Sequence, residues 1–151
     1  MRQSRFAFAI VVLLMSACSW GFADQQQPKL SGAEQSAIAD QIGKVKSSSD
    51  RQAIKSWSNA KKVAEFICRP AALHSLAKQE PSIDKVMLGT DDPATLSLES
   101  VGRLKGVGQY RKGDKWSDID FVCDIDPDTG KVSSFQWMTT GTSAVPGSPA
   151  Q

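Results

Sequence analysis

The chain has 151 residues, of which 40% are hydrophobic and 23% are charged, with 18 Lys and Arg against 16 Asp and Glu. This length suits one compact domain and leaves little room for a second. Cleavage of an N-terminal signal peptide would remove Arg2 and Arg5. The remaining chain would have 16 basic and 16 acidic residues and therefore no net charge. Nucleic-acid binding needs a net basic surface, so the composition excludes that class of function.

The N-terminus shows the order of features of a signal peptide. Two arginines in "MRQSR" precede the apolar run "FAFAIVVLLM", which is too short to span a bilayer as a helix. Two alternative processing sites follow this apolar run. We favour cleavage after Ala23, which makes residues 1–23 a signal peptide and predicts a periplasmic protein. The alternative is a lipobox ending in Cys18, whose lipid attachment would make the protein an outer-membrane lipoprotein.

Beyond the leader we expect a flexible N-terminus over 24–30, a single domain over 31–138 and a disordered tail over 139–151, because both ends lack a periodic apolar set. No stretch after the leader is long enough to span a membrane. Charge is unevenly distributed, with nine basic and five acidic residues in 24–79 but seven and eleven in 80–151. Either the two halves attract one another across the fold, or an acidic face is offered to a cationic partner.

The first half of the domain has helical patterns. Ser31 is followed three residues later by Glu34, the spacing of a capping box, and Ile38, Ile42 and Val45 then recur on one face. The segment "SSSD" ends this helix and caps a second. The second is expected to be one continuous helix, whose apolar face comprises Ala53, Trp57, Ala60, Ala64, Ile67 and Cys68.

Pro70 predicts a kink or break at Arg69, because its ring disfavours helical geometry in the preceding residue. A short helix then contains His74. Since this is the only histidine in the chain, we expect a structural or surface role for it and not a metal-binding or catalytic one.

The second half changes to the period of two that is typical of strands. Strands are expected over 83–88, 96–101, 102–111, 115–125 and 131–138, with turns at "KGD" and "DPDTG". One face of each strand is expected to carry its apolar and small residues: Leu104, Gly106, Gly108 and Tyr110, then Ile119, Phe121, Cys123 and Ile125, then Phe135 and Trp137. Residues expected on the other side are Arg103, Lys105, Gln109 and Arg111, then Asp118, Asp120 and Asp124. The fold class is therefore α+β, with N-terminal helices packed on a C-terminal antiparallel β-meander.

Cys68 and Cys123 are both expected to face the core of an exported domain, which favours a disulfide between them. In the chain-entropy model a bridge across this separation stabilises the fold by roughly 4 kcal/mol. Zinc would require four ligands, and two cysteines with one histidine do not supply them. A catalytic cysteine would require exposure and a base partner, and an apolar setting opposes both.

The second hairpin and its surroundings resemble a known family. The residues that carry the resemblance are Gly108, Tyr110, Arg111, Trp116, Ile119, Phe121, Cys123, Asp126, Asp128, Lys131, Val132, Ser134 and Phe135, with Cys68 upstream. Over roughly residues 60–137 the chain is similar to a family of small bacterial exported proteins, the domain of unknown function number nine hundred and thirty. The resemblance implies an exported α+β domain with a cysteine pair. It implies no activity, cofactor or catalytic residue.

The segment "DIDPDTG" has the acidic spacing of a calcium loop, but its glycine is at the seventh position and Phe135 stands where a glutamate belongs. We therefore expect no metal and no other cofactor. Asp118 and Asp120 could serve as the carboxylate pair of a hydrolase that acts on envelope glycans, although on an outward strand face they are typical of solubilising charge.

The leading hypothesis is a non-enzymatic envelope protein that binds a protein or an envelope polymer. Its candidate partner surface comprises Tyr110, Arg111, Trp116 and Trp137, because aromatic residues and arginine anchor interfaces. The alternative role of these residues is ordinary sheet packing. The parity of Trp116 is opposite to that of Phe121, so we expect it to face away from the core. The alternative functions are the glycan hydrolase and a periplasmic inhibitor of a lytic enzyme.

Overall fold

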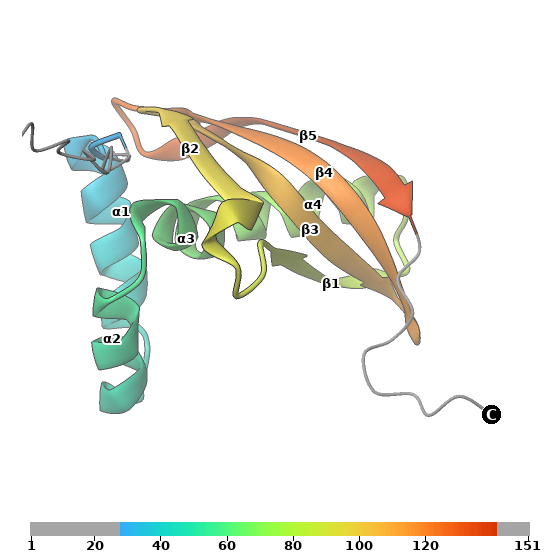
Figure 1. The fold of residues 1–151 in the computed structure, drawn as a ribbon, viewed down its shortest axis with the longest axis horizontal. Helices are drawn as coiled ribbons and strands as arrows, with labels where there is room; N and C mark the ends of the chain where they lie inside the picture. Colours follow the sequence, from blue (N-terminus) through green and yellow to red (C-terminus); the bar gives the residue numbers. More distant parts are fainter. Residues whose placement is uncertain (1–27, 142–151) are drawn as a thin grey trace, which may run out of the picture.

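The computed structural model describes residues 28–141 (Figure 1). The expected leader, with both of its alternative processing sites, and residues 142–151 of the expected tail lie outside the described residues. The first three residues of that tail, 139–141, belong instead to the last strand. In the described part of the chain, every helix is too short or too polar to cross a bilayer.

Helix α1 (Gly32–Gly43) begins as expected at a capping box. The backbone N–H of Glu34 donates to Ser31 Oγ at 3.1 Å, and the N–H of Ser31 donates to Glu34 Oε2 at 2.7 Å. These two bonds satisfy amides that a helix start leaves without partners. Ile38 is buried and Ile42 is packed against the core as predicted, but α1 ends at Gly43, so Val45 lies beyond the helix.

The prediction of one continuous second helix is wrong. The chain forms α2 (Ser48–Lys55), breaks over three residues, and resumes as α3 (Asn59–Val63). Ser56 Oγ donates to the carbonyl of Ala53 at 2.7 Å, and Ser58 Oγ accepts from the backbone N–H of Lys61 at 3.1 Å. Serine side chains that bond to nearby backbone groups end and start helices in this way. As a result Ala53 is exposed and Ile54 is buried in its place.

Pro70 does not break the helix. The chain passes from α3 into a π-helical turn, η1 (Ala64–Cys68), and then into α4 (Arg69–Gln79), with Pro70 in its first turn, where a missing N–H is tolerated. The N–H of Arg69 donates to the carbonyl of Ala64, one residue further back than in an α-helix. The apolar face therefore stays turned to the core through the junction, and the residues buried along it are Val63, Ala64, Ile67, Cys68, Ala72 and Leu76.

The five strands form one antiparallel sheet, in agreement with the predicted fold class. They are β1 (Ile83–Leu88), β2 (Leu96–Ser100), β3 (Arg103–Lys112), β4 (Lys115–Asp126) and β5 (Lys131–Gly141). Strands β3, β4 and β5 follow one another as hairpins, while β1 and β2 both pair with the other side of β3. A short 3₁₀ turn, η2 (Pro93–Thr95), precedes β2.

Helices cover one face of this sheet. Figure 1 shows α3 and α4 beneath the strands, with α1 and α2 at one end of the molecule. The core lies between the two layers and takes Leu104, Ile119, Phe121, Cys123 and Ile125 from the sheet. The predicted disulfide joins the layers, with 2.14 Å between the sulfur atoms and 6.2 Å between the Cα atoms of Cys68 and Cys123.

Two glycines of β3 lie against the backbone of neighbouring segments. A Cβ on Gly106 would lie 2.2 Å from the carbonyl oxygen of Thr95, and one on Gly108 would lie 2.6 Å from that of Met87. These close approaches come from the chain segments beside β3. The glycines therefore allow β1 and the start of β2 to pack side by side along one edge of β3.

Candidate functional site

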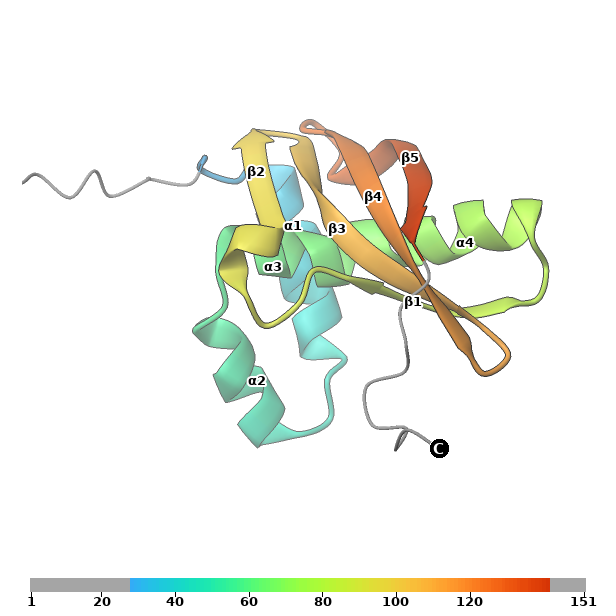
Figure 2. The ribbon, with the colours of Figure 1, turned by 45° about the vertical axis from the view of Figure 1, so that its right-hand side comes forward.

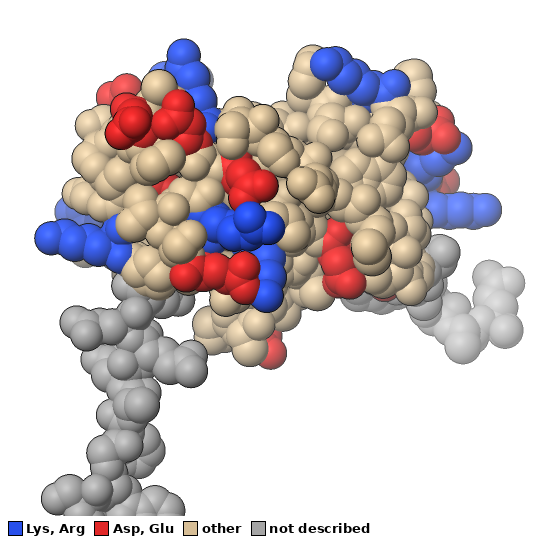
Figure 3. Space-filling view, turned by 90° about the horizontal axis from the view of Figure 1, so that it is seen from above, with Lys and Arg blue, Asp and Glu red and all other residues tan. Residues whose placement is uncertain are grey.

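The sheet face turned away from the helices is called the open face here, and no other described element covers it. Alternation along the strands places on it Met87, Lys105, Val107, Gln109, Arg111, Trp116, Asp118, Asp120, Val122, Gln136 and Met138. Met138 is 65% exposed, and Met87 and Val107 are 40% and 41% exposed. The view from above shows that uncharged side chains occupy much of the surface, with acidic and basic groups among them (Figure 3).

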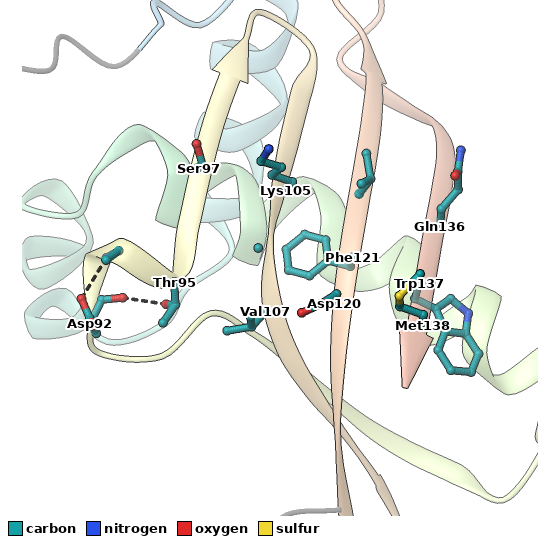
Figure 4. A pocket seen from close by; sticks show the side chains of 13 residues that line it. Asp92, Thr95, Ser97, Lys105, Val107, Asp120, Phe121, Gln136, Trp137 and Met138 are labelled. Atoms are coloured by element: carbon teal, nitrogen blue, oxygen red, sulfur yellow. Dashed lines mark hydrogen bonds between the residues drawn. The ribbon is translucent and has the colours of Figure 1, made fainter. Parts of the chain in front are cut away.

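A groove of about 720 Å³ lies on the open face. Its lining residues come from η2, β2, β3, β4 and β5, and they include Thr95, Ser97, Lys105, Val107, Asp120, Val122, Gln136 and Met138. Figure 4 shows Val107, Asp120 and Met138 side by side on neighbouring strands. The polar end near η2 is held by short-range bonds, because Asp92 Oδ1 accepts from the N–H of Ala94 at 2.9 Å and Thr95 Oγ1 donates to the carbonyl of Asp92 at 2.6 Å. The groove thus has apolar side chains in its middle and polar groups around them.

Asp120 occupies a distinctive place in this groove. The strand register sets it directly opposite Val107 on β3 and directly opposite Met138 on β5. Its side chain is exposed, and among the described residues no Lys, Arg or His nitrogen lies close enough to form an ion pair with it. The nearest lysine in the groove, Lys105, pairs instead with Glu99. Asp120 is therefore an unneutralised carboxylate between two exposed apolar side chains.

Asp118 has a different environment from Asp120. It lies two residues earlier on the same face of β4, and its Oδ1 accepts a hydrogen bond of 2.7 Å from Gln109 Nε2. It is partly buried and lines a neighbouring hollow of about 480 Å³. The two carboxylates proposed for a hydrolase thus share the open face, but one is held by a neighbour while the other is open to solvent.

The candidate partner surface is divided between the two sides of the sheet. Tyr110 and Trp137 lie on the helix-covered side, where their rings meet edge to face with centroids 5.9 Å apart. Arg111 and Trp116 lie on the open face, with the guanidinium 5.8 Å from the ring centroid of Trp116. Trp116 therefore faces away from the core as predicted. The four residues do not form one patch.

Arg111 is held in place by an ion pair. Its Nε and Nη2 donate to the two carboxylate oxygens of Asp84 at 3.0 and 2.6 Å. These hydrogen bonds lower the pKa of Asp84 and raise that of Arg111. Lys85 approaches the Trp116 ring from β1, with its Nζ 5.8 Å from the centroid. Arg111 and Trp116 thus form a fixed cluster on the open face beyond the groove.

The acidic turn between β4 and β5 uses its carboxylates internally. Asp126 Oδ1 accepts from the N–H of Asp128 at 2.9 Å, and this bond, with a further one from Thr129, lowers the pKa of Asp126. Among residues 28–141 no three His, Cys, Asp or Glu side chains are placed to hold a metal ion. His74 is exposed on α4. Nothing in this turn points to a ligand.

Sequence reasoning missed the groove. Its apolar residues could be recognised as outward-facing, because alternation along each strand turns Val107, Val122 and Met138 to the same side of the sheet as Asp120 and away from Phe121. What the sequence did not show is that three separate strands bring them together around one carboxylate. The signal available was an excess of apolar residues on the face expected to be polar.

The structure is that of an α+β protein with a disulfide between its helical layer and its sheet, and with a groove on the open face of the sheet. Comparison with protein-family models, with curated proteins and with solved structures found no match to this chain. The resemblance to the domain of unknown function therefore stays a prediction.

Proposed function

We propose that this protein is an exported, non-enzymatic binding module, and that it receives a segment of an envelope protein in the groove of the open face. The observation that carries the proposal is the position of Asp120 between Val107 and Met138, with no cationic partner among the described residues. A partner segment with one Lys or Arg flanked by apolar side chains would neutralise the carboxylate and cover the apolar surface around it.

The size and composition of the groove support such a partner. Binding sites are typically concave, largely apolar, and contain a few polar groups that set orientation, within a range of about 300–1,000 Å³. The groove has a volume of about 720 Å³. Exposed Met138 adds adaptability, because an unbranched thioether side chain can repack around different partners.

Charge supports a cationic partner as well. The sheet half has a net negative charge, and its basic residues are largely used in local ion pairs: Arg103 and Lys105 with Glu99, Arg111 with Asp84, and Lys112 with Glu80. In the helical half, Lys61 and Arg69 pair locally as well, both with Glu65. Of the two interpretations of the uneven charge, an acidic face offered to a partner is the one we propose.

Export is proposed on two grounds. The disulfide between Cys68 and Cys123 is of the kind that persists in oxidising compartments. The N-terminal sequence has the features of a signal peptide, or alternatively of a lipoprotein leader ending in Cys18. We propose the periplasm, with the outer membrane as the alternative if Cys18 is lipidated.

The glycan hydrolase is the second candidate, because Asp118 and Asp120 lie on one face of β4. Two residues along a strand place them roughly 7 Å apart, within the spacing of inverting glycosidases. A general acid in such an enzyme is normally buried in an apolar site, however, and Asp120 is exposed. Replacing both with asparagine without loss of cellular phenotype would remove this candidate.

The test of the binding function is site-specific photo-crosslinking in intact cells. A photoreactive residue at position 107 or 138 should capture the same envelope protein, whereas one at exposed Leu73 or Val101, outside the groove, should not. Adding Asp120→Lys should abolish the groove crosslinks while the protein level stays unchanged. Crosslinks of equal yield from all four positions, or crosslinks that persist with Asp120→Lys, would contradict the proposal.

A second measurement fixes the chemistry of the partner. A synthetic peptide with Arg between leucines should bind the protein, and the same peptide with Glu in place of Arg should not. Asp120→Asn should lower the affinity for the first peptide by about tenfold, which is the loss expected for one charge-assisted hydrogen bond. Asp128→Asn is the matched control, because Asp128 is exposed in the β4–β5 turn outside the groove.

A further inference from the structure

A second cleft lies among the first three helices, away from the open face. One stripe of α1 (Gln35, Ile38, Ala39 and Ile42) forms one wall, and the end of α2 and the start of α3 form the other. Its volume is about 450 Å³. Figure 2 shows α1 running beside α2 and α3 at this end of the molecule. Its floor is apolar: Leu30 and Ile38 belong to the core, and Ile42 is half-buried.

Three lysines surround this floor, and each comes from a different segment. Lys29 precedes α1, Lys55 ends α2 and Lys62 lies in α3. No Asp or Glu is among the residues that line the cleft. We refer to it as the lysine cleft.

The charges of the lysine cleft are not neutralised inside the described part of the protein. Lys62 Nζ donates to the backbone carbonyl of Lys55 at 3.2 Å, which leaves its charge without a counterion. Among residues 28–141 neither Lys29 nor Lys55 has a carboxylate partner, whereas Lys61, one residue from Lys62, pairs with Glu65 at 3.4 Å. Three ammonium groups around one cleft repel one another unless an anion lies between them.

We infer that the lysine cleft binds the surface of an anionic phospholipid membrane. Lysines around an apolar floor are the arrangement by which surface-bound helices contact a lipid bilayer, with ammonium groups at the phosphates and apolar groups at the acyl boundary. A free anion would neutralise the lysines but would leave the exposed part of Ile42 in contact with water. An acidic protein would need carboxylates at matching spacing as well as an apolar edge, and an anionic lipid supplies both features in one molecule.

The position of the cleft in the chain agrees with this assignment. Lys29 lines the cleft just before α1 begins, so the chain enters this helix at the rim of the cleft. Pro28 is ten positions after Cys18 in the sequence, which is at most about 36 Å of extended chain. A lipid on Cys18 would therefore hold the cleft close to a bilayer, and without it the cleft would still provide weak, reversible attachment. The open face of the sheet would stay available to a partner, because the cleft lies among the helices.

The experiment uses the unlipidated chain that begins at Asp24 and vesicles of stated composition. Sedimentation should show binding to vesicles of phosphatidylcholine mixed with phosphatidylglycerol, and none to phosphatidylcholine alone. Binding should fall as salt is raised, because exposed charges are screened. Each lysine near an anionic surface contributes about 1 kcal/mol, so the double variant Lys55→Gln with Lys62→Gln should lower the partition coefficient roughly 30-fold.

The matched control is Lys78→Gln with Lys115→Gln. It removes the same charge from two exposed lysines, one near the end of α4 and one at the β3–β4 turn, neither of which lines the cleft, and should lower partitioning much less. Thermal melts of both variants check that each is folded. An equal loss in the two double variants would mean that only overall charge matters, and would overturn the assignment. Absence of binding to anionic vesicles, or complete competition by millimolar inorganic phosphate, would overturn it too.

Discussion

Gly130, at the end of the β4–β5 turn, packs directly against Ala33 at the start of α1. A Cβ on this glycine would lie 2.6 Å from the carbonyl oxygen of Ala33, and its φ of +66° is one that side chains rarely adopt. The turn of the last hairpin thus rests on the N-terminus of the first helix and links the sheet to α1. Only glycine allows both the backbone angle and the close contact.

The first prediction is that Gly130→Ala lowers the free energy of unfolding by about 2–3 kcal/mol, through the strained backbone angle and the displaced helix start. Gly113→Ala separates the two causes. Gly113 has a φ of +60°, but a Cβ added to it would meet nothing within 4 Å. Gly113→Ala should therefore lower the free energy of unfolding by only about 1 kcal/mol. Urea unfolding of both variants gives the comparison, and equal losses would show that the contact with α1 contributes nothing.

The second prediction concerns the disulfide. Replacing Cys68 or Cys123 with serine should lower the free energy of unfolding by about 2–5 kcal/mol, because the bridge closes 55 residues between the helical layer and the sheet. The double replacement should cost little more than either single one, since both remove the same bridge. Thiol labelling of the unfolded, unreduced protein should find neither cysteine reactive; two reactive thiols per chain would refute the bridge.

The third prediction tests the break between α2 and α3. Ser58→Ala removes the side chain that accepts from the N–H of Lys61, and should lower the free energy of unfolding by about 1 kcal/mol. Ser48→Ala is the control, because Ser48 is exposed in the first turn of α2 and the cap there is Ser47. If the two variants are equally stable, Ser58 does not cap a separate helix.

The fourth prediction is a pH dependence at the Asp84–Arg111 pair. Hydrogen bonds from Arg111 lower the pKa of Asp84 from its ordinary value of 3.8. A lowered folded-state pKa means that the unfolded chain binds more protons, so the contribution of the pair is fully present above pH 3.8 and is lost as the pH falls through the folded-state pKa.

This dependence can be measured by urea unfolding between about pH 2 and 6. The difference in stability between the native sequence and Asp84→Asn should shrink as the pH falls below 3.8. Asp91→Asn is the comparison, since Asp91 is exposed in the loop after β1 and is not among the groups that shift the pKa of Arg111. A difference that stays constant down to the lowest pH would show that the ion pair does not contribute.

Local patterns in the sequence determined the elements and the faces. The capping box of Ser31 and Glu34 marked the start of α1, and alternation assigned Phe121 and Cys123 to the core and Trp116 to the opposite side. These features depend on residues within one turn or one strand, which is why sequence alone predicts them. The continuity of the second helix was mispredicted because the competing bonds of Ser56 and Ser58 oppose the apolar period there.

Tertiary structure alone decided which residues share a site. Alternation within β3 already separates Tyr110 from Arg111, which lie on opposite sides of the sheet, but it does not bring distant residues together. Val107, Asp120 and Met138 are distant in sequence and lie side by side, because the registers of two hairpins set them opposite one another. Register depends on turn lengths and on the bulges that shift β5 against β4, and these contacts between strands leave no periodic signal in the chain.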